Sequence, residues 1–230
     1  MIIPNHIAVI IDGNRRWAIT HGLKPWKGHW EGEKVVEKFL TWCLKLNVPE
    51  ISIYSLSTEN LKRSARELKE LVKVFVHGLK NLSKSDLIDK YQVHVNFVGN
   101  LSALPRSLVT LMEEIMRKTA KYTKKILNFL VGYGGHFEIL TAVEKLLKSA
   151  LKSGRVSITK RDIEKNLLVK NPVDLVIRAG GYARLSNFLP WQTAYSEIFV
   201  TDTLWPDFRR AQFFEALEEY SRRHRRFGAV

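Results

Sequence analysis

The stretch HIAVIIDGNRRW, residues 6–17, passes in one step from an apolar run to a charged segment. Ile7 to Ile11 form a short run rich in β-branched residues, which is typical of a buried strand. An aspartate, a glycine, an asparagine and two arginines follow at once. In an open parallel sheet, ligands bind beyond the carboxyl ends of the strands. The stretch therefore predicts both a parallel sheet and a ligand site at the end of its first strand.

Apolar runs of the same kind recur along the whole chain. They lie at 51–56, 93–98, 126–131, 174–177 and 198–201, and most of the segments between them carry apolar residues at helical spacing. We expect helices at 32–46, 64–85, 137–152, 160–168 and 207–225, with a capping box of Ser64 and Glu67 before the second and another helix opened by Pro105. The alternation predicts a single α/β domain, residues 1–230, with a central parallel sheet of about six strands flanked by helices on both faces.

The composition points to anionic partners. The 230 residues carry a formal net charge of +14, which favours nucleic acid, phosphorylated small molecules or an acidic membrane surface. The single cysteine, Cys43, excludes an intrachain disulfide and is expected in the core. The start MIIPNH lacks the basic segment of a signal peptide, and no apolar run approaches the roughly 18 residues of a membrane span. We therefore expect a cytoplasmic protein.

Polar and basic residues follow the expected strands and would meet at one edge of the sheet. After the first, second and fifth strands they are Asp12, Gly13, Asn14, Arg15, Arg16, Ser57, Thr58, Glu59, Asn60, Arg63, Arg178, Arg184 and Ser186. Guanidiniums bind phosphate oxygens as a fork, so five arginines at one edge predict more than one phosphate group. A carboxylate among phosphates requires a hard cation, so Asp12, helped by Glu197, is interpreted as an Mg²⁺ ligand. The alternative is that arginine–carboxylate pairs only tie loops together.

Several other chemistries lack their residues. The chain has no GxGxxG, no GxxxxGKS or GxxxxGKT, no GxSxG and no HExxH, which excludes the common nucleotide, hydrolase and zinc-protease motifs. Asn14 stands where a phosphatase of the haloacid dehalogenase type would need a second aspartate. His29, in the basic and aromatic segment KPWKGHW, is either a phosphate contact or a plain loop histidine.

Five blocks of sequence carry a resemblance to a known family. They are DGNRRWA (12–18), SLSTENLKR (55–63), GYGG (132–135), DLVIRAGGYARLSNFLPWQ (174–192) and AYSEIFVTDTLWPDF (194–208). In this order they resemble the cis-prenyltransferases of the undecaprenyl diphosphate synthase family, archaeal variants included, from about residue 6 to the RRFG at 225–228. Such enzymes condense isopentenyl diphosphate onto an allylic diphosphate, farnesyl or geranylgeranyl, and each new double bond is cis.

The resemblance implies a role for each matching residue. Asp12 would bind Mg²⁺ and help the allylic diphosphate leave, and Glu197 would complete the metal site. Asn60 matches the residue assigned to proton removal, but an amide is a poor base, so we expect it to orient the substrate while a diphosphate oxygen or water takes the proton. The substrate-binding residues implied are Gly13, Asn14, Arg15, Arg16, Trp17 and His29 for the allylic diphosphate, Ser57, Thr58, Glu59 and Leu61 beside Asn60, and Arg63, Arg178, Arg184, Leu185 and Ser186 for isopentenyl diphosphate.

The resemblance also implies a product and an assembly. The product would be a long-chain polyprenyl diphosphate, a precursor of glycosyl carrier lipids, made by a homodimer in which Arg226-Phe227-Gly228 reaches the partner's site. We expect an apolar tunnel between the sheet and the helices at 32–46 and 64–85, left open by the small Ser55. The chain departs from the bacterial pattern at Pro25 (an arginine there), Leu61 (a tryptophan), Tyr182-Ala183 (a Glu-His pair) and its end, RRFGAV.

Two other classes of function remain to be weighed. An RNA-binding module would use the net charge, Trp26, Trp30 and the basic SRRHRRF at 221–227, but the chain has no RNA-binding motif, so we expect no nucleic acid partner. A non-catalytic partner subunit would lack the aspartate of the first motif, whereas Asp12 and the STEN block are present. SRRHRRF is interpreted either as a peripheral contact with the acidic inner face of a membrane or as a solvated or dimer-contacting end.

Overall fold

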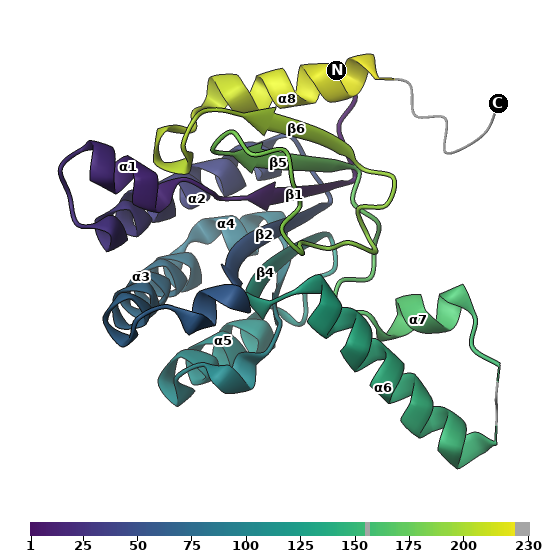
Figure 1. Ribbon diagram of the computed structural model, residues 1–230. Helices are drawn as coiled ribbons and strands as arrows, with labels where there is room; N and C mark the ends of the chain where they lie inside the picture. Colours follow the sequence, from purple (N-terminus) through teal and green to yellow (C-terminus); the bar gives the residue numbers. More distant parts are fainter. Residues whose placement is uncertain (155–156, 224–230) are drawn as a thin grey trace.

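β1 (His6–Ile10) lies in the middle of a six-stranded sheet whose order is β3-β4-β2-β1-β5-β6 (Figure 1). The computed structural model describes residues 1–154 and 157–223. The other strands are β2 (Glu50–Ser57), β3 (Val93–Val98), β4 (Lys125–Tyr133), β5 (Leu175–Ala179) and β6 (Glu197–Thr201). All strand pairings are parallel. The predicted α/β fold with a parallel sheet of six strands is therefore confirmed.

Five helices contribute to the larger apolar cluster on one face of the sheet. They are α2 (Gly28–Lys45), α3 (Ala65–Lys84), α4 (Asp86–Tyr91), α5 (Arg106–Thr119) and α8 (Arg210–Arg222). As expected, the Ser64 side chain caps α3 by accepting from the Glu67 backbone N–H. The remaining elements are α1 (Asn14–Thr20), α6 (Gly135–Ser153) and α7 (Lys160–Asn166), with the 3₁₀ turns η1 (Pro25–Lys27), η2 (Glu59–Lys62), η3 (Leu101–Ala103) and η4 (Trp205–Asp207). Among the described residues, no helix has both the length and the apolar character that a membrane span requires.

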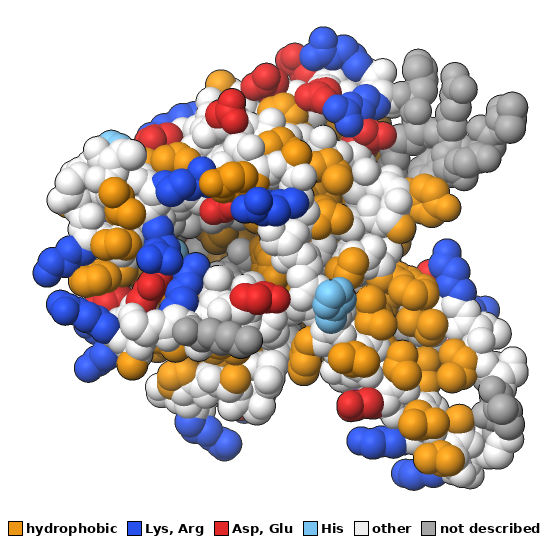
Figure 2. All heavy atoms as spheres, in the orientation of Figure 1, with side chains coloured by type: hydrophobic (Ala, Val, Ile, Leu, Met, Phe, Trp, Pro, Cys, Tyr) orange, Lys and Arg blue, Asp and Glu red, His pale blue; other side chains and the backbone are white. Residues whose placement is uncertain are grey.

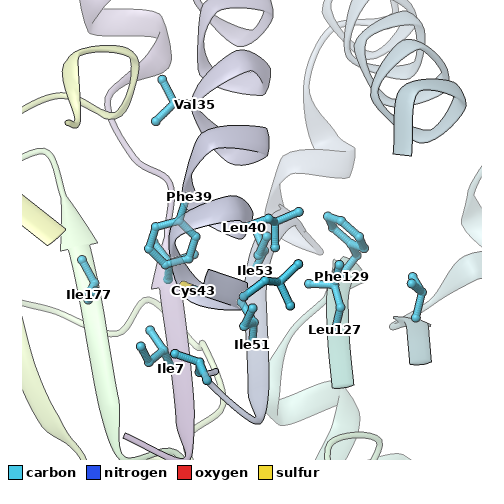
Figure 3. Close-up of a cluster of buried hydrophobic side chains, with 14 of the residues drawn as sticks. Ile7, Val35, Phe39, Leu40, Cys43, Ile51, Ile53, Leu127, Phe129 and Ile177 are labelled. Atoms are coloured by element: carbon cyan, nitrogen blue, oxygen red, sulfur yellow. The ribbon is translucent and has the colours of Figure 1, made fainter. Parts of the chain in front are cut away.

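Packing against the sheet fixes α2 in place. Figure 3 shows Phe39, Leu40 and Cys43 of α2 lying over the central strands. Phe39 is fully buried and meets Trp205 edge to face, with 5.8 Å between ring centroids. Burying one such aromatic side chain stabilises the fold by roughly 1.5–3 kcal/mol. The same packing places the first turn of α2, which carries His29, beside the end of β1.

The opposite face of the sheet is covered mainly by irregular segments, not by helices as expected. The residues buried there include Val169, Val173, Phe188 and Leu189, which meet the strands in a second, smaller apolar cluster. α6 and α7 leave this face and project from the body of the molecule as an arm (Figure 1). One stripe of α6 is apolar and exposed, with exposed fractions of 63% for Leu140, 43% for Val143, 56% for Leu147 and 77% for Leu151. Figure 2 shows hydrophobic side chains along this arm.

One buried carboxylate ties the covering segments to the sheet. Glu138 accepts a hydrogen bond from the Tyr133 hydroxyl at the end of β4. It also accepts from the backbone N–H groups of Leu168 and Val169 at 2.6 and 2.9 Å, and from Gln192 Nε2 at 3.1 Å. A buried carboxylate is stable only when it is hydrogen-bonded. These contacts therefore fix the loop between β5 and β6, which carries Ser186.

Candidate active site

An open cleft lies where the carboxyl ends of β1, β2 and β5 meet. Here the strand order reverses, since β2 and β5 lie on opposite sides of β1, and open parallel sheets bind ligands at this point. The cleft has a volume of about 790 Å³, and Figure 2 shows Lys and Arg side chains around a hollow on this side of the molecule. The predicted residues that line it are Asp12, Gly13, Asn14, Arg15, Arg16, His29, Ser57, Glu59, Asn60, Arg63, Arg178 and Ser186.

A largely buried ion pair joins β5 to the end of β1. The Arg178 side chain is 4% exposed, and its Nη2 donates to Asp12 Oδ2 at 2.9 Å. Nη1 donates to Ser186 Oγ at 2.9 Å and to the Arg184 carbonyl. Arg16 Nη2 lies 3.6 Å from the second oxygen of Asp12. Because a buried guanidinium without a partner is costly, these contacts fix the orientation of Asp12.

Glu67 holds two further arginines in one place. Arg63 Nη1 donates to Glu67 Oε1 at 2.9 Å, and Arg15 Nε lies 3.5 Å from the same oxygen. The carboxylate thus joins an arginine of α1 to one that precedes α3. The sequence analysis gave Glu67 only a capping role, although its position four residues after Arg63 was a signal that the two side chains could meet.

Several site residues carry buried polar atoms without a partner. Among the described residues no hydrogen bond reaches Asn14 Oδ1, Trp17 Nε1, His29 Nε2 or Arg178 Nε. Buried polar atoms in proteins are nearly always satisfied, so a cluster of exceptions marks a place where a polar ligand binds. Burial first, and then the charges of Arg63 and Arg15, lower the pKa of His29 to about 4. The imidazole is therefore neutral near pH 7.

Glycines allow close packing at the start of the site. Gly13 has φ +102°, and an added Cβ would lie 2.8 Å from Leu204 Cδ2, so only glycine fits there without strain. Asn14 lines the cleft and is buried, and its Nδ2 donates to the Ile11 carbonyl at 2.8 Å. A Cβ at Gly32 of α2 would lie 2.0 Å from Asn14 Oδ1. Asn14 therefore also supports the contact of α1 with α2.

The STEN segment holds Asn60 by a reciprocal pair of hydrogen bonds. Asn60 N donates to Ser57 Oγ at 3.2 Å, and Ser57 N donates to Asn60 Oδ1 at 3.3 Å. Because Oδ1 is engaged, the amide is held in one orientation, as a group that orients a substrate would be. Glu59 Oε1 accepts from Asn187 Nδ2 at 3.4 Å, which links this segment to the loop after β5.

The loop after β5 carries backbone strain. Ser186, Asn187 and Leu189 have φ values of 51°, 64° and 47°, a region that non-glycine residues rarely adopt. The Tyr54 hydroxyl donates to the Ser186 carbonyl at 3.3 Å, and Gly135 N donates to the Asn187 carbonyl at 2.7 Å. Strained residues of this kind collect at functional sites, where the surrounding structure holds them.

Some predicted residues lie beside the cleft and do not line it. They are Trp17, Thr58, Leu61, Arg184 and Leu185. Trp17 stacks on His21 with 4.1 Å between ring centroids, and Leu185 packs against the smaller apolar cluster. The lining residues that sequence reasoning did not assign to the diphosphate site include Ile19, Tyr54, Leu71 and Asn187. Three of these are apolar or aromatic residues, which look like ordinary core in a sequence.

Glu197 does not reach Asp12 within the chain, so this prediction is corrected. Glu197 is the first residue of β6 and pairs with Leu175 at the start of β5, whereas Asp12 follows the end of β1. Because a strand rises about 3.3 Å per residue, strands of this length place the amino-terminal and carboxyl-terminal ends of the sheet roughly 15 Å apart. Glu197 Oε2 instead accepts from Arg223 at 2.6 Å.

Within residues 1–154 and 157–223, no group of three or more His, Cys, Asp or Glu side chains is placed to hold a metal. The predicted motif Arg226-Phe227-Gly228 lies outside the described residues.

The cleft continues into an apolar cavity of about 120 Å³. The residues that line both spaces form the mouth of the cavity, and they are Ile11, Asn14, His29, Ser55 and Leu71. The deeper wall comes from α2, α3 and the sheet and includes Val36, Leu40, Val74, Phe75, Leu79, Leu127 and Phe129. The predicted apolar space therefore lies between the sheet and the two helices expected to enclose it. An arginine-lined cleft that opens into an apolar cavity is typical of a protein that binds ligands with a phosphorylated head and a hydrocarbon tail.

Comparison with known proteins gives the same class. The family model described as "Putative undecaprenyl diphosphate synthase" matches residues 10–228. The tritrans,polycis-undecaprenyl-diphosphate synthase (geranylgeranyl-diphosphate specific) of Pyrococcus horikoshii is 41% identical over 99% of this chain and 88% of its own length. The ditrans,polycis-undecaprenyl-diphosphate synthase ((2E,6E)-farnesyl-diphosphate specific) of Buchnera aphidicola is 39% identical over 99% of this chain and 92% of its own length.

Solved structures agree with the sequence comparisons. Lavandulyl diphosphate synthase from Lavandula x intermedia, in complex with dimethylallyl diphosphate, superimposes with a TM-score of 0.93 at 31% identity and 98% coverage of both chains. A probable undecaprenyl diphosphate synthase from Campylobacter jejuni gives a TM-score of 0.82 at 28% identity, with coverage of 99% of this chain and 100% of the other. The chain belongs to the undecaprenyl diphosphate synthase family of cis-prenyltransferases.

Proposed function

We propose that the protein condenses isopentenyl diphosphate onto an allylic diphosphate and repeats this step to make a long-chain polyprenyl diphosphate, a precursor of a glycosyl carrier lipid. One observation carries the proposal: the arginine-lined cleft opens through the mouth residues into an apolar cavity. The diphosphate head remains among charges while the hydrocarbon tail lies in a space that excludes water. An RNA-binding surface would have no use for such a cavity.

Two sets of arginines divide the work of holding two diphosphates. Arg15 and Arg16, with the unpartnered ring nitrogen of His29, would bind the allylic diphosphate at the cavity mouth. Arg63, Arg178 and Arg184, with Ser186, would bind isopentenyl diphosphate. The two sets are tied together by carboxylates: Glu67 pairs with Arg15 and Arg63, and Asp12 pairs with Arg16 and Arg178, so guanidiniums of both sets are held in position before a substrate arrives. Such preorganised charge is what a reaction that releases diphosphate needs.

Asp12 is the proposed ligand of Mg²⁺. It is the carboxylate that lines the cleft beside two arginines, and its side chain is 34% exposed. Mg²⁺ commonly binds through one or two carboxylates together with substrate phosphates and waters, so one aspartate fits. When bound, the ion supplies positive charge for the diphosphate that leaves as the allylic C–O bond breaks. Removing the Asp12 charge should therefore weaken pyrophosphate binding in Mg²⁺ and leave it equal or stronger in EDTA.

The chain's own residues position the reaction and do not form a covalent bond to the substrate. A carbon–carbon bond forms between the alkene of isopentenyl diphosphate and the allylic carbon, diphosphate leaves, and one proton is lost. The fixed amide of Asn60 would orient the isopentenyl group, and a diphosphate oxygen or water would accept the proton. Ser57, Thr58 and Glu59 would support Asn60 from the same segment.

The starter is the part of the proposal on which the relatives divide. Curated relatives of similar identity are named as specific for geranylgeranyl or for farnesyl diphosphate. We propose geranylgeranyl diphosphate, because several relatives at 39–41% identity are named as specific for it. Competition between the two starters at equal concentration tests this directly, and a preference for farnesyl diphosphate would contradict it.

A homodimer is the proposed assembly. The exposed apolar stripe of α6, formed by Leu140, Val143, Leu147 and Leu151, supports a partner surface, and a second copy of the chain presents the same stripe. Approach of Arg226-Phe227-Gly228 to the partner's site remains a prediction, as do a cytoplasmic location and contact of SRRHRRF with a membrane.

The test of the proposed function is product formation. Labelled isopentenyl diphosphate is supplied with farnesyl or geranylgeranyl diphosphate, and the butanol-extractable product is sized by mass spectrometry and its double bonds assigned by NMR. The proposal expects a polyprenyl diphosphate with newly formed cis bonds. Absence of product with either starter, from folded protein, would refute it.

A further inference from the structure

Tyr182 stands among the arginines proposed to bind the two substrates. It follows Gly180 and Gly181, which have φ values of +89° and +79° and turn the chain back after β5. The N–H groups of Gly180 and Gly181 donate to the Thr203 and Thr201 carbonyls, both at 2.9 Å, which anchors the turn. The Tyr182 residue is 41% exposed. Its position is therefore set by the backbone and not by burial of its ring.

Three guanidiniums from different segments surround the Tyr182 ring. Arg184 Cζ lies 4.1 Å from the ring centroid, Arg16 Cζ 4.7 Å and Arg178 Cζ 6.0 Å. Each distance is within the range of about 6 Å over which a cation is attracted to the face of an aromatic ring. Arg16 belongs to the proposed allylic half of the site, and the other two belong to the isopentenyl half. The ring therefore lies between the two halves.

The cluster has more positive than negative charge. Asp12 pairs with Arg178 at 2.9 Å and lies 3.6 Å from Arg16. In the described part of the chain, no carboxylate lies within 4.0 Å of the Arg184 guanidinium. Without another source of attraction, Arg184 would be repelled by its neighbours and would extend into solvent. The Tyr182 ring, whose centroid lies 4.1 Å from Arg184 Cζ, supplies such an attraction.

An aromatic ring and a carboxylate differ in whether they occupy the N–H groups of a guanidinium that they attract. A carboxylate accepts hydrogen bonds and occupies the guanidinium N–H groups that a diphosphate needs. The face of a ring attracts the cation while the N–H groups remain free. The Tyr182 hydroxyl makes no hydrogen bond to the described residues, so the ring alone carries the contact.

We propose that Tyr182 is a positioning residue whose ring holds Arg184 and Arg16 ready for the two diphosphates and couples the two halves of the site. The inference rests on the proposed function, since it assigns the ring to arginines that bind diphosphate. It goes beyond that function because it assigns a role to Tyr182, which is neither a carboxylate nor a metal ligand. Arg184 is nearest to the ring, so the isopentenyl half depends on Tyr182 most.

The experiment compares Tyr182→Ala, Tyr182→Phe and Tyr182→Glu with the wild type. The dissociation constant of inorganic pyrophosphate is measured by calorimetry, and KM and kcat are measured for each substrate. Tyr182→Ala should weaken pyrophosphate binding and raise KM for isopentenyl diphosphate by roughly 5- to 30-fold, with a smaller rise for the allylic substrate. Tyr182→Phe should restore wild-type values. Tyr182→Glu should bind pyrophosphate no better than Tyr182→Ala.

A matched control separates this role from general stability. Tyr122, whose ring faces Lys121 at 5.0 Å and does not line the cleft, is replaced in Tyr122→Ala, and pyrophosphate affinity should not change. Equal affinities of wild type, Tyr182→Ala and Tyr182→Phe would overturn the inference while leaving the proposed function intact. A Tyr182→Phe variant as weak as Tyr182→Ala would also overturn it. A wild type that neither binds pyrophosphate nor forms product would instead refute the proposed function.

Discussion

Replacing Ser55 with leucine should shorten the product. Ser55 is one of the mouth residues, so every carbon atom that enters the cavity from the cleft passes it. Its hydroxyl donates only a long hydrogen bond, 3.3 Å, to the Ile53 carbonyl. The change therefore removes little from the fold and adds apolar bulk at the mouth of the cavity.

The size of the effect follows from the burial of hydrocarbon. Each isoprene unit adds five carbon atoms, and transfer of one CH₂ from water is worth about 0.8 kcal/mol. A unit kept out of the cavity loses on the order of 3–4 kcal/mol, which corresponds to several hundred-fold in the partition between a chain that stays and one that leaves. The lost hydroxyl contact costs only about 1 kcal/mol of stability.

The assay is the length distribution of labelled product, resolved by thin-layer chromatography and mass spectrometry. Ser55→Ala is the matched control, because it removes the same hydroxyl and leaves the mouth open. Ser55→Leu should give products several units shorter than those of wild type and Ser55→Ala, with the first condensation retained. An unchanged distribution from an active Ser55→Leu enzyme would show that the chain does not grow into this cavity.

Three further changes test other parts of the account. Gly13→Ala places a side chain at φ +102° against Leu204 and should lower the free energy of unfolding by about 2 kcal/mol, measured in urea, and reduce turnover by displacing Asp12. His29 has its pKa lowered from 6.5 to about 4, so stability present above pH 6.5 should be lost as the pH falls toward 4, by up to ~3 kcal/mol. Urea unfolding across this range should show a smaller loss in His29→Asn. Leu147→Glu should convert the dimer to monomer in analytical ultracentrifugation, whereas Lys148→Glu on the same helix should not.

Each of these three has a result that contradicts it. A Gly13→Ala variant with unchanged stability would mean that the turn relaxes easily. Parallel pH curves for wild type and His29→Asn would show that His29 is not buried in its neutral form. A Leu147→Glu variant that remains dimeric would place the partner surface elsewhere than on α6.

The strands and the location of the site could be predicted because each depends on a local pattern. Runs such as Ile7 to Ile11 mark buried parallel strands, and the residues after a strand must lie at its carboxyl end. The cavity was expected for another reason: the growing chain implied by the family resemblance needs an apolar tunnel, and the cavity lies between the sheet and α2 and α3. Ser55 was expected at this cavity and lies at its mouth.

The contacts that the sequence did not reveal are long-range. Glu67 looks like a helix cap, and only the fold brings Arg15 of α1 to the same carboxylate. α1 itself was missed because a helix of seven residues is too short to show a clear apolar period. The direction of a strand also matters: Glu197 lies in a family motif, but it starts β6, so one chain cannot bring it to Asp12. The presence of a residue in a family motif predicts its role, but it does not predict at which end of a strand the residue lies.

The most direct test of the central claim is incorporation of labelled isopentenyl diphosphate into butanol-extractable product with geranylgeranyl diphosphate as the starter. Wild type and Asp12→Asn are compared in Mg²⁺ and in EDTA, because asparagine keeps the shape of Asp12 and removes its charge. The account predicts product only from wild type in Mg²⁺, with incorporation by Asp12→Asn at least a hundredfold lower. Equal incorporation by Asp12→Asn, or product from wild type in EDTA, would contradict the assignment of this cleft as a metal-assisted diphosphate site.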